Sequence, residues 1–155
     1  ALLVIDMREA LLAADAERPS RVAAVEGLVA RARAGGHPVI WITDSGAAGL
    51  AAGLRPAPDE LQLEKTTADA FESTELEAEL TILAVEQIVL CGLGAQGDIE
   101  ATARGGAANG FEVIVADDAR PASAGAGTPR GEDGAVPLLG EIERVRLVPP
   151  AEIFA

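Results

Sequence analysis

Four charged residues in this chain stand at the ends of predicted buried strands. Asp6, Asp44 and Lys65 each close such a strand, and Asp98 follows a glycine-rich turn over residues 92–97. Carboxylates and a lysine can supply a general acid, a general base and a charge partner for hydrolysis. The same residue types also cap helices or end strands in solvent. From spacing alone, a cap and a site residue are equal interpretations of Asp6, and a solvated strand end is favoured for Lys65.

The sequence alternates predicted strands with predicted helices. Continuous apolar runs predict buried strands, and apolar residues three or four apart predict helices with one buried face. The predicted strands are residues 1–6, 39–43, 61–64, 88–91, 113–116 and 145–148; the predicted helices run from Ser20 to the glycines 35–36 and over residues 73–84, 98–109 and 136–142. This order predicts a three-layer α/β/α fold with a six-stranded, mainly parallel, Rossmann-like sheet in a single domain, residues 1–155. Ligands bind such sheets beyond the carboxyl ends of the strands, where the four charged residues fall.

The composition excludes several classes of function. A net charge of −13 argues against nucleic acid and anionic membranes as partners and is typical of a soluble protein. The chain has no apolar run of ~18 residues and no signal segment, so no membrane span is predicted. One cysteine excludes an internal disulfide and favours the cytoplasm, and the single histidine excludes a histidine-rich metal site. The Ala, Gly and Arg bias suggests a bacterial gene. Ala1 already lies in an apolar run, which leaves open whether residues precede it.

Four short motifs occur in order along almost the whole chain. They are Val4-Ile5-Asp6-Met7; Lys65 followed by Phe71, Thr74 and Leu76; residues 92–98 followed by Thr102-Ala103; and Asp117-Asp118-Ala119. Each motif alone is weak, but their order and distances resemble those of the isochorismatase-like hydrolases, also called the cysteine hydrolase family. The resemblance implies the α/β/α fold, a small-molecule substrate and a tendency to form dimers or larger oligomers.

The resemblance also implies roles for individual residues. Asp6 matches the general acid/base of the family, and Lys65 matches its charge partner. The Leu93–Gly94 peptide matches a cis peptide bond of the family, which would turn a backbone N–H toward the substrate. The amides of Gly94 and Asp98 would then form an oxyanion hole at a helix N-terminus.

Two positions depart from the family pattern. Asp98 stands where most members have the nucleophilic cysteine, and a carboxylate attacking an amide would give a mixed anhydride rather than a thioester. Amidase chemistry that depends on cysteine is therefore disfavoured, and Cys91, inside a strand, is predicted to be a buried apolar group. One branch of the family, the isochorismatases, protonates a vinyl ether through the aspartic acid and uses water as the nucleophile. Arg8 replaces a glutamine, and could equally bind a substrate carboxylate or neutralise Asp98.

Several further residues are candidates for contact with the substrate. Trp41 is expected either to fill the core or to form an aromatic wall of the pocket, with core filling favoured. Phe71 falls at the family's phenylalanine position, where local core packing is the alternative. Leu93 and Gly94 are expected to contact the substrate through the turn. Asp44 is followed by residues without histidine, so no metal is predicted, and no other cofactor is implied.

Three functions compete on this evidence. The first is a small-molecule hydrolase that uses Asp6 and Lys65, with Asp98 as a third catalytic candidate and water as the nucleophile. The second is a ligand-binding pseudoenzyme on the same fold, favoured by the departures at Arg8 and Asp98. The third, weaker function is nucleotide binding, because Gly92-Leu-Gly-Ala-Gln-Gly97 matches a glycine-rich pattern after a strand.

Overall fold

A six-stranded parallel sheet forms the centre of the molecule. The computed structural model describes residues 1–13, 15–46, 49–93, 97–116 and 142–155. The strands are β1 Leu2–Ile5, β2 Val39–Asp44, β3 Leu61–Lys65, β4 Gln87–Gly92, β5 Glu112–Ala116 and β6 Val145–Val148. They lie in the order β3-β2-β1-β4-β5-β6, and every pairing is parallel. This confirms the predicted sheet, and places all six predicted strands within two residues of their observed bounds.

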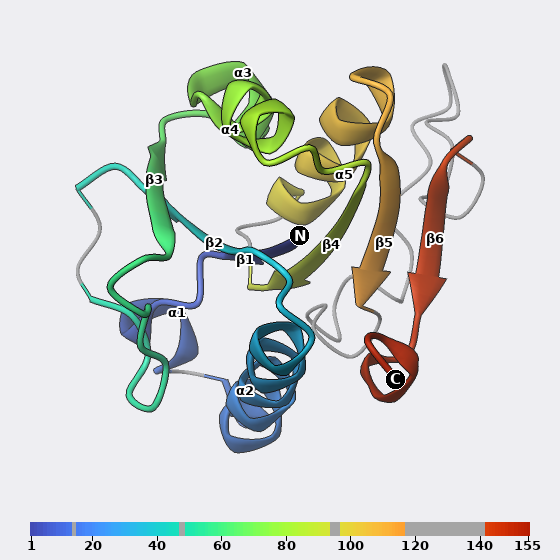
Figure 1. Ribbon diagram of the computed structural model, residues 1–155. Helices are drawn as coiled ribbons and strands as arrows, with labels where there is room; N and C mark the ends of the chain where they lie inside the picture. Colours follow the sequence, from blue (N-terminus) through green and yellow to red (C-terminus); the bar gives the residue numbers. More distant parts are fainter. Residues whose placement is uncertain (14, 47–48, 94–96, 117–141) are drawn as a thin grey trace, which may run out of the picture.

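Helices cover both faces of the sheet. They are α1 Glu9–Leu12, α2 Arg18–Ala34, α3 Ala70–Ser73, α4 Leu76–Ile82, α5 Asp98–Ala108 and a 3₁₀ turn, η4, at Pro150–Glu152. Figure 1 shows α2 on one face and α3, α4 and α5 on the other, which is the predicted three-layer arrangement. The helix predicted over residues 136–142, and Asp117-Asp118, fall largely or wholly outside the described residues. Within the described ranges, no helix is both long and apolar enough to span a membrane.

The apolar runs of the strands are explained by burial on both faces. In β1, Leu2 and Val4 pack on the α2 side, while Leu3 and Ile5 pack on the side of α3, α4 and α5. All four are at most 1% exposed. Burying each such side chain stabilises the fold by roughly 1.5–3 kcal/mol. A strand with polar residues at every second position, as in a sheet covered on one face only, would lose this stabilisation on its second face.

Two helix starts differ from the prediction. Ser20 lies inside α2, and its hydroxyl donates to the carbonyl oxygen of Glu17. Ser73 ends α3 instead of capping one long helix, because its hydroxyl oxygen accepts the N–H groups of Thr66 and Thr67. The N-cap of α4 is Glu75, whose side chain makes no cap hydrogen bond; Oγ1 of Thr74, one residue earlier, accepts the N–H of Leu76 at 3.1 Å. The predicted helix over residues 73–84 therefore corresponds to α4 and is shorter at both ends, while α3 before it and α1 were not predicted.

Gly92, at the end of β4, allows the strands to end close together. It has a φ of +123°, and a Cβ atom there would lie 2.0 Å from the carbonyl oxygen of Ile5 on β1. The N–H of Leu93 donates to that same oxygen at 2.9 Å. Only a residue without a side chain fits this close approach of two backbones. The turn that leads from β4 to α5 therefore starts directly beside the end of β1.

We expect Gly92→Ala to prevent folding or to lower the free energy of unfolding by well over the ~1–2 kcal/mol that left-handed backbone alone costs a non-glycine residue. The matched control is Gly110→Ala, since Gly110 has a φ of +89° but no atom within 4 Å of the place that a Cβ would occupy. Urea unfolding of both variants separates the clash from the backbone conformation. Equal losses of stability in the two variants would contradict the close-approach explanation.

Candidate active site

Five charged side chains meet at the carboxyl ends of the central strands. Asp6 follows β1, Asp44 ends β2, Lys65 ends β3, Asp98 begins α5 after β4, and Arg8 follows Asp6. Ion pairs of 3.4 Å or less connect Arg8 and Lys65 to the carboxylates. We call these five residues the charged cluster. Strand order reverses between β1 and β4, so the cluster lies where parallel sheets of this kind bind ligands.

Asp6 is the most buried member of the charged cluster. Its side chain is fully buried, and its φ of +48° lies in the left-handed region, which Asp tolerates better than most residues. Oδ1 accepts the backbone N–H of Asp44 at 2.9 Å, and Oδ2 lies 3.0 Å from Nζ of Lys65. The ends of β2 and β3 therefore hold the carboxyl group of Asp6, one at each of its two oxygens.

Lys65 lies at the centre of the charged cluster. It is 1% exposed, and its Nζ contacts Asp6, Asp44 and Asp98. Its contacts with Asp44 and Asp98 are hydrogen bonds, and its contact with Asp6 is an ion pair of 3.0 Å, so three carboxylates surround the ammonium group. The predicted charge partner is thus brought to Asp6. The solvated strand end that spacing alone favours for Lys65 is wrong, because the side chain is buried.

Asp98 joins the charged cluster from the N-terminus of α5. Gly97, with a φ of +102°, is the N-cap and turns the chain into the helix. Asp98 is 6% exposed, and its Oδ2 lies 2.8 Å from Nζ of Lys65. Asp98, which the sequence resemblance alone matches to the family cysteine, therefore faces the same ammonium as Asp6.

Arg8 pairs with Asp44. Its Nη2 lies 2.9 Å from Oδ2 of Asp44, and its Nε lies 3.4 Å from Oδ1 of Asp6. Among the described residues, no ion pair joins Arg8 to Asp98. The sequence-based alternative that Arg8 neutralises Asp98 is therefore wrong in its partner, since Lys65 has that role.

Asp44 was not among the predicted site residues, although the sequence places it at a strand end. Its side chain is 36% exposed and bonds both cations of the charged cluster. The missed signal is its register: Asp44 is the pairing partner of Lys65 between β2 and β3. Paired residues of neighbouring parallel strands point to the same side of the sheet, so a carboxylate and a lysine there meet.

Burial and charge shift the pKa values of the cluster in opposite directions. Burial raises the pKa of Asp6 above its ordinary range, although Lys65 and the backbone N–H of Asp44 oppose the rise and the charge of Asp44 adds to it. Burial by itself lowers the pKa of Lys65, but the three carboxylates that it contacts outweigh burial and hold that pKa above its ordinary value. The site therefore combines a carboxyl group that resists ionisation with a lysine that stays charged.

Among the described residues, the three carboxylates of the charged cluster also have a spacing that could hold a metal ion. Oxygens of Asp6, Asp44 and Asp98 lie within 4.8 Å of one another. Nζ of Lys65 contacts all three, so the protein supplies its own cation to this group. A metal ion here would have to displace a buried ammonium, and its ligands would be carboxylate oxygens, which suit hard cations.

The structure does not bring Trp41 or Phe71 to the charged cluster. Trp41 packs in the core on the α2 side, and its indole N–H donates to Glu60 at 2.7 Å. Phe71 packs on the other face, with its ring 5.7 Å from that of Phe111. Both side chains therefore lie in core packing, because strand alternation turns Trp41 toward α2 and α3 turns Phe71 toward α5.

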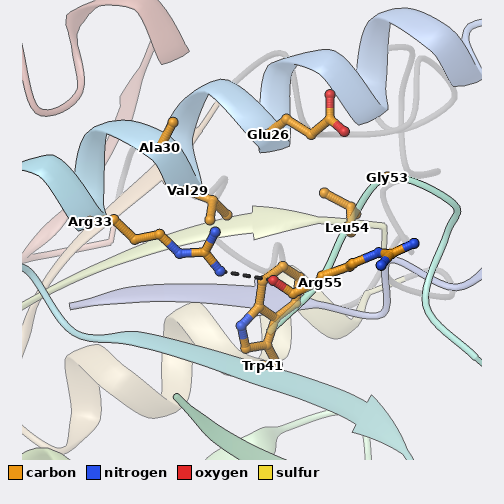
Figure 2. Close-up of a pocket in the computed structure, with 8 residues that line it drawn as sticks. All are labelled: Glu26, Val29, Ala30, Arg33, Trp41, Gly53, Leu54 and Arg55. Carbon is orange, nitrogen blue, oxygen red and sulfur yellow. Dashed lines mark hydrogen bonds between the residues drawn. The ribbon is translucent and has the colours of Figure 1, made fainter. Parts of the chain in front are cut away.

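A pocket of about 270 Å³ lies on the α2 side, apart from the charged cluster. Figure 2 shows its lining, in which the guanidinium of Arg33 donates to the carbonyl oxygen of Arg55. Trp41 forms part of this pocket, which shares no residue with the charged cluster. Glu60 accepts hydrogen bonds from Arg33 and Trp41, and so ties α2 to β2. The chemistry of the charged cluster makes it the better candidate for an active site.

The remaining predicted contacts lie around the turn after β4. Leu93 is 6% exposed and lies in the core on the α2 side. Gly94 falls outside the described residues, and with it the predicted cis peptide and one amide of the oxyanion hole. Cys91 is fully buried, and burial raises the pKa of its thiol to about 12. This agrees with the predicted buried apolar group and leaves no reactive thiolate at that position.

Comparisons with known proteins agree on one family. The family model of the isochorismatase domain matches residues 1–137. The uncharacterized isochorismatase family protein YecD of Escherichia coli O157:H7 is 30% identical over 146 residues, which cover 77% of this chain and 78% of YecD. Streptothricin hydrolase of Streptomyces noursei is 31% identical over 133 residues, 77% of this chain and 48% of the relative. The chain thus spans about half the length of the streptothricin hydrolases it matches.

Solved structures have the same fold. An isochorismatase from Pseudomonas putida KT2440 superposes with a TM-score of 0.80 at 22% identity, covering 97% of this chain and 88% of the other. N-carbamoylsarcosine amidase from Thermoplasma acidophilum superposes with a TM-score of 0.78 at 19% identity, covering 98% and 96%. At these identities the likeness is one of fold.

We expect Lys65→Met to lower the free energy of unfolding by about 3–5 kcal/mol near pH 7, because it leaves buried carboxylates without their cation. Without the ammonium, the pKa values of these acids rise in the folded state, so stability is lost as pH rises above the unfolded value of about 4 and returns toward acid. Urea unfolding from pH 4 to 8 checks this.

The control is Arg144→Met, which removes an ion pair to Glu112 that is almost half exposed on both sides. Such surface pairs contribute about 0–1 kcal/mol, with little change over this pH range. A Lys65→Met variant as stable as this control would show that the charged cluster is not held by its ammonium.

Proposed function

Because this chain belongs to the isochorismatase family, whose named relatives are hydrolases, we propose that it hydrolyses a small molecule at the charged cluster without a cysteine nucleophile. The observation that supports this most is the pairing of Asp6 with Lys65. A fully buried carboxyl group lies 3.0 Å from a buried ammonium at the carboxyl edge of the sheet. A proton donor and a permanent charge partner are the two groups that this chemistry requires.

In the proposed mechanism, Asp6 is the general acid and then the general base. Its proton passes to the substrate, to the carbon of a vinyl ether or to the atom of a leaving group. Lys65 stabilises the carboxylate that remains and keeps its own protons throughout. Water adds to the electron-poor carbon, and the proton that it loses returns to Asp6. For a vinyl ether this gives a hemiketal, whose C–O bond then breaks: Asp6 donates its proton to the departing alcohol and takes up the proton of the hydroxyl that becomes the carbonyl. For a substrate protonated on its leaving group, that group departs as the bond to the same carbon breaks. The backbone amide of Asp98, and that of Gly94 as expected from the family, would bind oxygen charge that develops in the transition state.

Asp98 has a supporting role in this proposal. Its carboxylate can orient the attacking water or stabilise positive charge on the substrate, and it is paired with Lys65 at 2.8 Å. An acyl transfer to this carboxylate would give a mixed anhydride, which offers a poor route for amides. The nucleophile is therefore water, supplied by the solvent that reaches the exposed side of the cluster at Asp44.

A ligand-binding protein without hydrolytic activity is the second candidate. The observation in its favour is that the ammonium of Lys65 already faces three carboxylates of its own chain, one of them at the position of the family cysteine. A substrate would have to compete with these contacts. A cytoplasmic location and self-association remain predictions from composition and family resemblance.

Turnover of a substrate panel tests the first candidate. The panel contains streptothricin and N-carbamoylsarcosine, which the relatives' names supply, together with vinyl ethers and activated esters. Asp6→Asn should lower kcat by about 10²–10⁴-fold, because the amide keeps the shape but cannot donate the proton. Asp59→Asn, an exposed carboxylate in the loop before β3, is the control and should keep full activity.

Equal traces of activity in wild type and Asp6→Asn would contradict the proposal and leave the second candidate. A strong loss of turnover in Asp98→Asn would argue against the second candidate, since a vestigial side chain is dispensable. The same panel thus distinguishes the two.

Chemistry independent of cysteine has its own test. We expect Cys91→Ala to keep kcat within about twofold of wild type, at some cost in stability from the buried cavity. Iodoacetamide should leave the native enzyme active, because a buried thiol with a raised pKa is not alkylated. Rapid inactivation that Cys91→Ala abolishes would mean that the thiol takes part in catalysis.

A further inference from the structure

Asp44 contacts more members of the charged cluster than its place in the sequence suggests. Its backbone N–H donates to Oδ1 of Asp6 at 2.9 Å. Its Oδ1 accepts from Nζ of Lys65, and its Oδ2 accepts from Nη2 of Arg8 at 2.9 Å. One residue therefore bonds the acid of the proposed mechanism through its backbone and both cations through its carboxylate.

The two cations that Asp44 binds are also the two that neighbour Asp6. Nζ of Lys65 lies 3.0 Å from Oδ2 of Asp6, and Nε of Arg8 lies 3.4 Å from Oδ1. Neither oxygen of Asp6 has a hydrogen bond from these cations within the described residues: Oδ2 accepts none, and Arg8 Nε donates none. Arg8 and Lys65 instead donate hydrogen bonds to Asp44, and Lys65 also donates one to Asp98.

We infer that Asp44 is a positioning residue: its carboxylate accepts hydrogen bonds from Lys65 and Arg8 that would otherwise go to Asp6, and this lets Asp6 keep the proton that it donates. Only the purpose of this role, which is to keep a proton on Asp6 for catalysis, rests on the proposed function. The contacts themselves are properties of the folded protein. No function has been assigned to Asp44 from the sequence or the family comparison, and the role differs from metal binding because it acts through two side-chain cations.

The charges around Asp6 set the direction of the effect. Asp44 faces it from β2, Lys65 from β3, Asp98 from the start of α5, and Arg8 from the segment before α1. Removing the charge of Asp44 removes one repulsion and frees both cations to bond Asp6. Both changes favour the ionised form of Asp6, so its pKa must fall.

The test is a ¹³C NMR titration of the side-chain carboxyl of Asp6, with the resonance assigned by its disappearance in Asp6→Asn. In Asp44→Asn the backbone N–H to Asp6 remains and only the charge is lost. The titration midpoint of Asp6 should move to lower pH than in wild type. Asp44→Glu, which restores the charge, should move it back toward the wild-type value.

Glu64→Gln is the matched control. Glu64 is an exposed carboxylate one residue before Lys65, and strand alternation turns it away from the charged cluster. Its loss should leave the Asp6 midpoint unchanged. An unchanged midpoint in Asp44→Asn, or an equal shift in Glu64→Gln, would overturn the inference, because the effect would then be absent or a matter of net charge alone.

Asp44→Asn also has an expected effect on turnover. With a substrate from the panel, the high-pH limb of the kcat profile should move to lower pH, since that limb reports loss of the proton from Asp6. The NMR result does not depend on turnover. A shifted midpoint without any hydrolysis would keep the positioning role and reject the proposed function, whereas hydrolysis with an unshifted midpoint would do the reverse.

Discussion

The ammonium group of Lys65, buried among three carboxylates, is the constraint on which the rest of the structure depends. A buried charge is tolerated when opposite charges and hydrogen bonds offset its loss of hydration. For Lys65 this brings three carboxylate oxygens, from the residue after β1, from the end of β2 and from the start of α5, to one nitrogen on β3. These segments are far apart in the sequence, so the cluster specifies how the central strands and the helix after β4 must end relative to one another.

Several local features follow from that requirement. Gly92 lets the backbone leave β4 against the carbonyl oxygen of Ile5, and Gly97 turns it into α5. Asp6 adopts a left-handed φ directly after β1. Non-glycine residues in this region cost of order 1 kcal/mol or more, and such conformations gather at functional sites. The cluster has three carboxylates and two cations, one more negative than positive charge when all are ionised. Burial raises the pKa of Asp6, which is the direction that reduces this excess of negative charge.

Much of this could be predicted from the sequence, because apolar runs and strand ends are local signals. Burial on both faces makes each strand a continuous apolar run, and parallel strands bring their carboxyl ends to one edge, so the placing of Asp6, Lys65 and Asp98 followed from order alone. The partner of Arg8 did not, since an arginine can reach several acids and its contact with Asp44 joins residues 36 apart in the sequence. Trp41 could not be placed either, because which face of a strand an indole takes depends on α2 and on Glu60, 19 residues away. The break between α3 and α4 depends on a tertiary contact of Ser73 with residues 66–67.

The account stands on water as the nucleophile beside an acid and a lysine, with Asp98 in support. A single turnover in H₂¹⁸O with excess enzyme, using a substrate found in the panel and read by mass spectrometry, tests this directly. The account predicts that one atom of ¹⁸O enters the product in the first turnover and that the peptide containing Asp98 stays unlabelled. An unlabelled first product, with ¹⁸O in the Asp98 carboxylate, would show that Asp98 forms a covalent intermediate and would contradict the account.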